Sequence, residues 1–343
     1  MNAFPLFIHG HGGISSAGCG SETLHRAVAD GRDIAVAEMA IETNHKTLTY
    51  RHRPVDRSVL KTVLPKHPRL RRASDVTKFA LIAAHEAIGE GRMEKIRARS
   101  LRVGIVMTFI NGCVNYTNRF FGEVLEDPTL ASPILFPETV FNAPAGHIAT
   151  FLECDGPVYT LIGDSAAWFS ALGVAEEWIA ADLVDGCLIL CAEEIDRLTL
   201  QGLRFYSRDL IATEGAAAIY VEANRSPIAI QSLNGPFDYT DANERRTAIR
   251  EAWDAVKRSS PDLLVDGLTG ANRIDRDEAE VIANLPSPRL SPAKILGEGM
   301  GVRCGFQTVA AIGALQAGAT SASILASGGN QHAFSATLIR DDS

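Results

Sequence analysis

The sequence predicts a layered α/β fold made of two similar halves. Apolar runs of strand length alternate with longer segments of helical periodicity along most of the chain, which is the pattern of an α/β protein. An internal repeat supports the division into two halves, because residues 168–194 and 305–330 are both predicted to form a helix, a short break and a buried strand. A repeat of this kind indicates a duplicated unit.

The first half is expected to begin with a short strand at 5–8 that runs into a glycine-rich turn at 9–18. These glycines favour a backbone bend over a phosphate loop, because no Gly-Lys-Ser/Thr follows them. The other elements expected here are helices at 22–31, 75–88 and 166–179, a helix that begins after 136–147, and strands at 101–107, 158–162 and 187–191.

The second half is expected to be shorter and to repeat the same alternation. Its predicted strands lie at 216–222, 228–233, 263–265 and 322–326, and its predicted helices at 243–258, 277–284 and 306–316. We therefore divide the chain into 1–215 and 216–343.

Composition excludes several classes of protein. The 343 residues are 46% hydrophobic and 22% charged, which is ordinary for a globular protein, and no apolar run reaches the length of a membrane span. A net charge of −8 argues against broad nucleic-acid binding. The six cysteines show no CxxC pairing and no signal peptide is visible, so we expect free thiols and a cytoplasmic protein.

The segment 158–194 contains the candidate nucleophile. An apolar strand ends at Ile162, Gly163-Asp164-Ser165 makes a tight turn, and a long apolar-faced helix follows. A strand that breaks sharply into a helix presents the turn side chain in front of unpaired N–H groups that stabilise negative charge. Ser165 is therefore a candidate nucleophile, with the alternative that it only caps the helix.

Several motifs in chain order resemble those of the elongating β-ketoacyl synthases. They are the glycine-rich start, Asn142-Ala143-Pro144-Ala145-Gly146-His147, Gly156-Pro157 before the central strand, Glu214-Gly215-Ala216, Asp275 with Glu278, and Lys294 before a Gly-x-x-x-Gly stretch. The resemblance implies the thiolase-like fold, with five αβαβα layers built from two βαβαβαββ halves, and a dimer.

The residues that condense acyl groups in that family are replaced here. The resemblance places Ser165 at the family's nucleophilic cysteine, Gly267 at its first histidine and Glu298 at its second. A serine hydroxyl needs an adjacent base to become a nucleophile, and a carboxylate has the wrong sign to stabilise an enolate. Ordinary condensation is therefore not expected.

Other matching positions imply structural or compensating roles. Glu278 and Lys294 match a pair that braces the floor of the family's active site, and Asp275 matches a loop anchor. Residues 327–334 match a loop beside the family's nucleophile, so we expect His332 near Ser165, where Glu298 would orient it. A structural His332, and a Glu298 held by Lys294 or an arginine, are the alternatives.

Two functions follow from the resemblance. The first is a non-condensing, chain-length-factor-like partner of an active ketosynthase in fatty-acid or polyketide biosynthesis. The second is an acyltransferase or thioester hydrolase that uses Ser165 and His332. Both imply acyl groups carried on the phosphopantetheine of an acyl carrier protein, no bound cofactor or metal, and assembly as a heterodimer or homodimer through the strand at 158–162. Arg71 and Arg72 are the candidate docking residues for the carrier protein.

Overall fold

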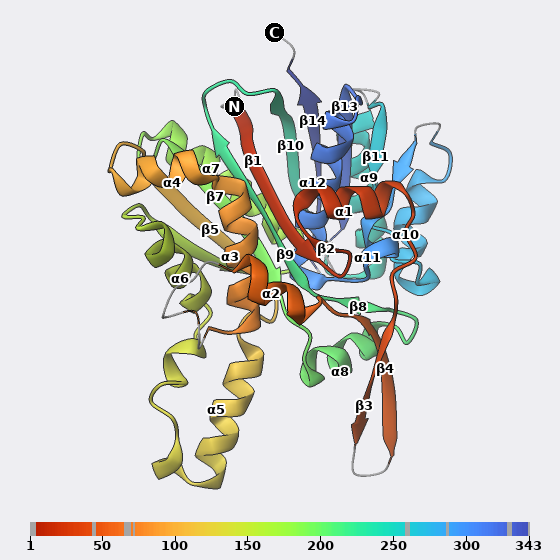
Figure 1. Cartoon of the computed structure of the whole chain (residues 1–343). Coiled ribbons are helices and arrows are strands. Elements are labelled where there is room, and N and C mark those ends of the chain that lie inside the picture. The colour runs from red at the N-terminus through yellow and green to blue at the C-terminus, as the bar shows by residue number, and fades with distance from the viewer. Residues whose placement is uncertain are drawn as a thin grey trace.

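The computed structural model describes residues 5–42, 46–64, 70, 73–257, 261–285, 288–327 and 331–341 (Figure 1). Arg71 and Arg72 lie outside these ranges. None of the described helices is long and apolar enough to cross a membrane.

Two halves with the same order of elements make up the fold. The first half comprises β1 (Leu6–Ser15), α3 (Asp75–Ile88), β5 (Val103–Phe109), α6 (Ala143–Leu152), β6 (Val158–Ile162), α7 (Ala167–Ala180), β7 (Gly186–Glu193) and β9 (Gly215–Glu222). The second comprises β10 (Ile228–Asp238), α9 (Ala242–Lys257), β11 (Leu263–Val265), α10 (Asn272–Ile282), β12 (Arg289–Leu290), α12 (Arg303–Gln316), β13 (Ser321–Ser327) and β14 (His332–Arg340). Each half is a βαβαβαββ unit, as the sequence predicts.

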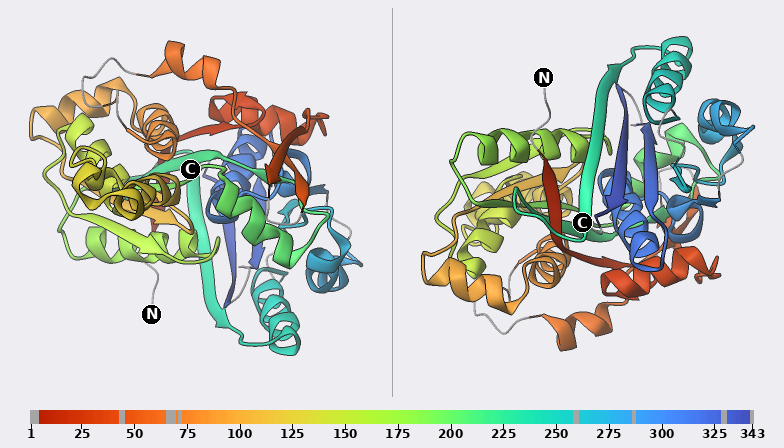
Figure 2. Two further views of the ribbon diagram at one scale, coloured as in Figure 1. Left: turned by 90° about the horizontal axis from the view of Figure 1, so that it is seen from below. Right: turned by 90° about the horizontal axis from the view of Figure 1, so that it is seen from above.

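The order of strands repeats as well. It runs β6-β5-β7-β9-β1 in the first half and β12-β11-β13-β14-β10 in the second, and β1 meets β10 where Leu6 and Phe7 pair with Ile230 and Ala229. In the view from above, β10 lies beside the blue strands β13 and β14 (Figure 2). Because β9 pairs with β7 and β1, we place the junction of the halves between Glu222 and Ile228, later than the division at 215 that the sequence suggests.

Three hydrophobic cores define the layers. The central core joins α7 and α12 to one face of the strands of both halves. A second core packs α3 and α6 on the outer face of the first half, and a third packs α9 and α10 on the outer face of the second. The layers are therefore helix, sheet, helix, sheet, helix, and the predicted inner face of α7 (Trp168, Leu172, Ala175 and Ile179) is buried.

Most of the glycine-rich start is a strand, and the turn expected within residues 9–18 lies only at 16–17, between β1 and β2. β1 continues through Gly10, Gly12 and Gly13, with a register shift in its pairing with β9 between Ile8 and Gly10, and it packs directly on α3. A Cβ atom on Gly10 would lie 1.9 Å from the carbonyl oxygen of Ala87, and one on Gly12 would lie 2.2 Å from that of Ala83. The close approach of β1 to α3 leaves no room for a Cβ atom at Gly10 and Gly12, and this explains why both positions are glycine.

Additional elements extend from this frame. They are β2 (Gly18–Cys19), α1 (Ser21–Ala29), β3 (Ala37–Glu42), β4 (Thr47–Arg53), α2 (Arg57–Val63), α4 (Glu90–Arg97), α5 (Val114–Glu126), η2 (Pro128–Leu130), η3 (Phe136–Glu138), α8 (Arg197–Tyr206), β8 (Ala212–Thr213), α11 (Pro292–Leu296) and η4 (Met300–Val302). The β3–β4 hairpin and α5 project from the same end of the molecule, opposite the two chain ends (Figure 1).

Candidate functional site

Ser165 lies on the wall of a cavity of about 650 Å³ at the start of α7. The Gly163 N–H donates to the carbonyl oxygen of Phe109 (3.0 Å), which fixes the turn against β5. The side chain of Asp164 accepts from the Ala166 N–H (3.0 Å), so Asp164 and not Ser165 satisfies a backbone donor at the helix start. Ser165 is buried. Because its hydroxyl does not cap the helix, that hydroxyl is available for another contact.

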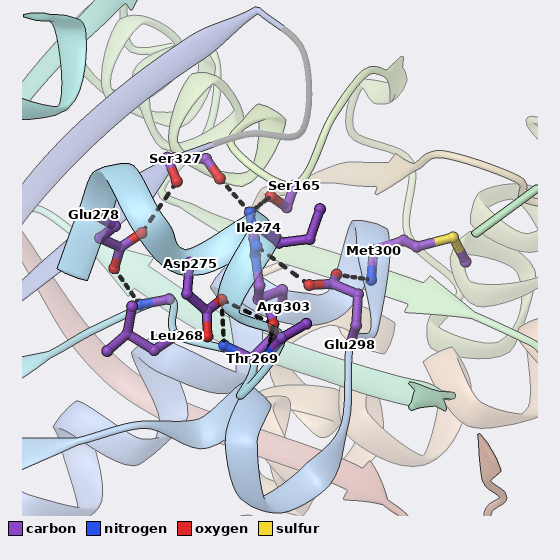
Figure 3. A network of polar contacts seen from close by, with 12 residues as sticks. Ser165, Leu268, Thr269, Ile274, Asp275, Glu278, Glu298, Met300, Arg303 and Ser327 are labelled. Atoms are coloured by element: carbon purple, nitrogen blue, oxygen red, sulfur yellow. Dashed lines mark hydrogen bonds and ion pairs between the residues drawn. The ribbon is translucent and has the colours of Figure 1, made fainter. Parts of the chain in front are cut away.

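Arg303, the first residue of α12, makes that contact. Its Nη2 donates to Ser165 Oγ (2.9 Å) and to the carbonyl oxygen of Ser327, and its Nη1 lies 3.2 Å from Glu298 Oε2 (Figure 3). The side chain of Arg303 is only 7% exposed. A buried guanidinium thus occupies the space in front of the serine and links the two halves of the fold.

The charge of this arginine is balanced by buried carboxylates. Burial alone would lower the pKa of Arg303, but Glu298, with Cys304 and Glu278, more than offsets that effect, so its pKa is raised and the guanidinium stays charged. Burial raises the pKa of Glu278, which accepts from the Gly267 N–H (2.6 Å) and from the hydroxyl of Ser327 (3.0 Å). The site is therefore an ion cluster that ties α10, α12 and β13 together.

Neither histidine position of the resemblance offers a base. Gly267 has no side chain, and a Cβ atom there would lie 3.1 Å from Glu278 Oε2. Glu298 accepts from the Met300 N–H (2.7 Å) and pairs with Arg303, so an arginine is the partner of this carboxylate. Neither position therefore holds a histidine, and the carboxylate of Glu298 is engaged by a backbone N–H and a guanidinium.

The predicted floor pair is not formed. Lys294 lies exposed on α11, and within the described ranges no ion pair joins it to Glu278, whose carboxylate is satisfied by Gly267 and Ser327. The exposed position of Lys294 on a short helix explains the difference. Asp275 does anchor a loop: it accepts from the N–H groups of Thr269 (2.9 Å) and Gly270 (2.7 Å) and from the Thr269 hydroxyl (2.8 Å).

His332 does not form a triad with Ser165 and Glu298. Its Nδ1 lies 3.5 Å from Asp164 Oδ2 and its Nε2 lies 3.6 Å from Asp238 Oδ1. The first residue of β14 is held in this place by pairing with Asp238 in β10. Among the described residues, no hydrogen bond connects its imidazole to Ser165, and positions 328–330 of the expected loop at 327–334 lie outside them.

A buried carboxylate shapes another wall of the cavity. Glu193, at the end of β7, accepts from the N–H groups of Ile110 and Asn111, and Ile110 lines the cavity. Burial raises the pKa of Glu193 to about 8. The neutral form is therefore favoured through part of the physiological range.

The sequence reasoning missed Arg303. No motif marks it, and the only signal is a single arginine between Gly301-Val302 and an otherwise apolar helix. A charged side chain that is buried at the start of a helix needs a partner of opposite charge. The sequence alone does not give the distance between Arg303 and Glu298 in the folded chain.

An apolar surface lies along the open edge of the sheet. β6 pairs only with β5 in the described structure, and its Val158, Tyr159 and Ile162 are exposed. α5 has no buried residue, and Leu125 on it is 71% exposed. Exposed apolar side chains beside an unpaired strand edge indicate a protein interface.

Similarity to known proteins is detected through structure. No protein-family model matches the sequence, and no curated protein does. The chain has the thiolase-like α/β fold, which it shares with solved structures of ketosynthases. A chain of the ishigamide ketosynthase/chain length factor matches with a TM-score of 0.79 and 18% identity, over 98% of this chain and 99% of that one.

Two further structures agree. A chain of ketosynthase ApeO in complex with its chain length factor ApeC, from Xenorhabdus doucetiae, gives a TM-score of 0.80 at 14% identity, over 98% of both chains. A β-ketoacyl synthase from Burkholderia phymatum STM815 gives 0.80 at 18% identity, over 98% of this chain and 99% of that one. The expected resemblance to the β-ketoacyl synthases is therefore confirmed at the level of the fold.

Proposed function

We propose that the chain is a non-condensing, chain-length-factor-like partner of an active β-ketoacyl synthase in carrier-protein-dependent fatty-acid or polyketide biosynthesis. The observation that carries this proposal is the contact between Arg303 and Ser165. A guanidinium cannot accept a proton from the serine, so it cannot serve as the base that a serine nucleophile needs. With Gly267 and Glu298 at the histidine positions, the residues of this site hold the fold together and do not perform condensation.

The open edge supports the assembly part of the proposal. An exposed apolar strand edge favours pairing with a partner strand, and the exposed apolar side chains of α5 are further candidates for a protein contact. Structural neighbours include ketosynthases crystallised with a chain length factor. Those assemblies provide the kind of partner that we propose for this chain.

The test is co-expression with a condensing β-ketoacyl synthase from the same genome, followed by size-exclusion chromatography with light scattering. We expect a heterodimer from the native chain. Tyr159→Arg, which places a charge on the β6 edge, is expected to weaken assembly at least tenfold, since aromatic anchors contribute most at interfaces. The control is Phe205→Arg, an equal change at a side chain that is 87% exposed on α8.

Two results would contradict the assembly proposal: a monomer of the native chain in the presence of the ketosynthase, or equal weakening by both substitutions. Docking of the acyl carrier protein through Arg71 and Arg72 is part of the same proposal. Reversal of both charges is expected to weaken carrier binding at low salt and to have little effect at high salt, because exposed charge pairs are screened. No change at low salt would refute that docking site.

A further inference from the structure

The cavity beside Ser165 has the composition of a binding site for an amphipathic anion. Apolar side chains from several elements form much of its wall: Ile110, Ile162, Leu203, Leu210, Ile274 and Met300. Its volume of about 650 Å³ lies within the usual range of small-molecule sites, roughly 300–1,000 Å³. The wall is therefore suited to an aliphatic chain.

The charges that line the cavity favour an anion. Four arginines line it (245, 273, 276 and 303) against three carboxylates (Asp164, Asp277 and Glu298), an excess of one positive charge in a chain of net charge −8. Asp277 is already engaged by Arg245 at 3.1 Å. The starts of α7 and α12 both lie here, and helix N-termini add positive potential.

Arg303 has unused capacity for hydrogen bonding. Its Nε–H is buried and has no hydrogen-bond partner among the described residues, although its two Nη atoms are engaged. Ser165 accepts from Arg303 through its oxygen, and its hydroxyl is also hydrogen-bonded to the side chain of Cys304, so Nε of Arg303 is the donor that remains. An unused donor on a buried cation is costly unless an acceptor arrives.

We propose that this cavity binds an unesterified aliphatic carboxylic acid without a covalent bond. The carboxylate accepts from Arg303, and the aliphatic chain lies along the apolar wall. Glu298 competes with this carboxylate, because it already takes one face of the guanidinium at 3.2 Å. This ligand site is independent of the proposed partner role, since it lies within one chain and needs no second subunit.

The test is isothermal titration calorimetry of the purified full chain with decanoate and with decanamide, its neutral isostere. We expect decanoate to bind at least tenfold more tightly. Arg303→Gln is expected to weaken decanoate binding at least tenfold, whereas Glu298→Gln is expected to strengthen it severalfold by removing the competing charge. Arg97→Gln, at an exposed arginine on α4, is the matched control and is expected to bind decanoate as the native chain does.

Opposite effects of two substitutions in one ion pair separate ligand binding from simple loss of structure. Equal binding of decanoate and decanamide by the native chain would overturn the proposal, as would no binding of either. Unchanged decanoate binding by a folded Arg303→Gln variant would do the same. Should that variant fail to fold, Leu203→Trp on α8 decides the matter: it fills the cavity from its wall and is expected to abolish decanoate binding, and unaltered binding would overturn the proposal.

Discussion

Replacement of Arg303 by methionine tests the ion cluster that fills the site. Arg303→Met keeps the volume of the side chain and removes its charge. Glu298, whose side chain is 8% exposed, is then left as a buried carboxylate without a cation, and Ser165 Oγ and the Ser327 carbonyl lose a donor. Removing one partner of a buried ion pair costs about 3–5 kcal/mol.

The size of the effect can be measured by thermal unfolding followed by circular dichroism. A loss of this size lowers the melting temperature of a protein of this length by roughly 4–7 °C. The double variant Arg303→Met with Glu298→Gln removes the stranded charge, so it is expected to be more stable than Arg303→Met alone. Such recovery is the signature of two residues that interact directly.

An exposed ion pair on α4 provides the control for this measurement. Arg97→Met, which breaks an exposed pair with Glu153, is the control and is expected to cost no more than about 1 kcal/mol. A melting temperature of Arg303→Met equal to that of the native chain, or no recovery in the double variant, would refute the reasoning.

Three further predictions follow from the site and the fold. Incubation with acyl-carrier thioesters is expected to give no acyl adduct on the chain by intact-mass spectrometry, because no base is hydrogen-bonded to Ser165 among the described residues. An adduct that Ser165→Ala removes would contradict this. Burial raises the pKa of Glu193 to about 8 and the pKa of Glu194 and of Asp266 to about 7, so the native state binds more protons than the unfolded chain. The melting temperature is therefore expected to fall as the pH rises from about 5 to 8, and Glu193→Gln is expected to make this fall less steep. A melting temperature that rises over this range would contradict the prediction. Gly10→Ala is expected to destabilise the chain strongly, because the added Cβ would meet a backbone oxygen of α3. Gly173→Ala, in α7, has no atom within 4 Å of the added Cβ and is expected to be neutral or to stabilise the chain by up to about 1 kcal/mol. Equal melting temperatures for the two variants would contradict the packing argument.

The fold could be predicted because its signals are local and repeated. The inner face of α7 follows from apolar spacing, and the duplication follows from the internal repeat at residues 168–194 and 305–330. The start of the chain was harder: glycines are typical of turns, and only the close packing of β1 on α3 explains Gly10 in a strand. The junction of the halves depends on which strands pair with β9, which no local pattern encodes.

The candidate site was predictable only in part. The turn before α7 places Ser165 from local sequence alone, and Asp275 anchors its loop through near neighbours. Partners distant in the chain were not predictable: Arg303 reaches Ser165 across 138 positions, and Lys294 is exposed and forms no ion pair with Glu278 among the described residues. Side-chain pairing between the halves depends on packing geometry, which the sequence alone does not give.

The most direct test of the proposed role is a condensation assay with malonyl and acyl groups on the acyl carrier protein. We predict no carbon dioxide release and no β-ketoacyl product from this chain alone. Product is expected when the condensing ketosynthase that assembles with this chain is added, at the same rate with the native chain and with Ser165→Ala. The ketosynthase alone is expected to give no product or shorter products. Condensation by this chain alone, or loss of product in the mixture with Ser165→Ala, would contradict the non-condensing role.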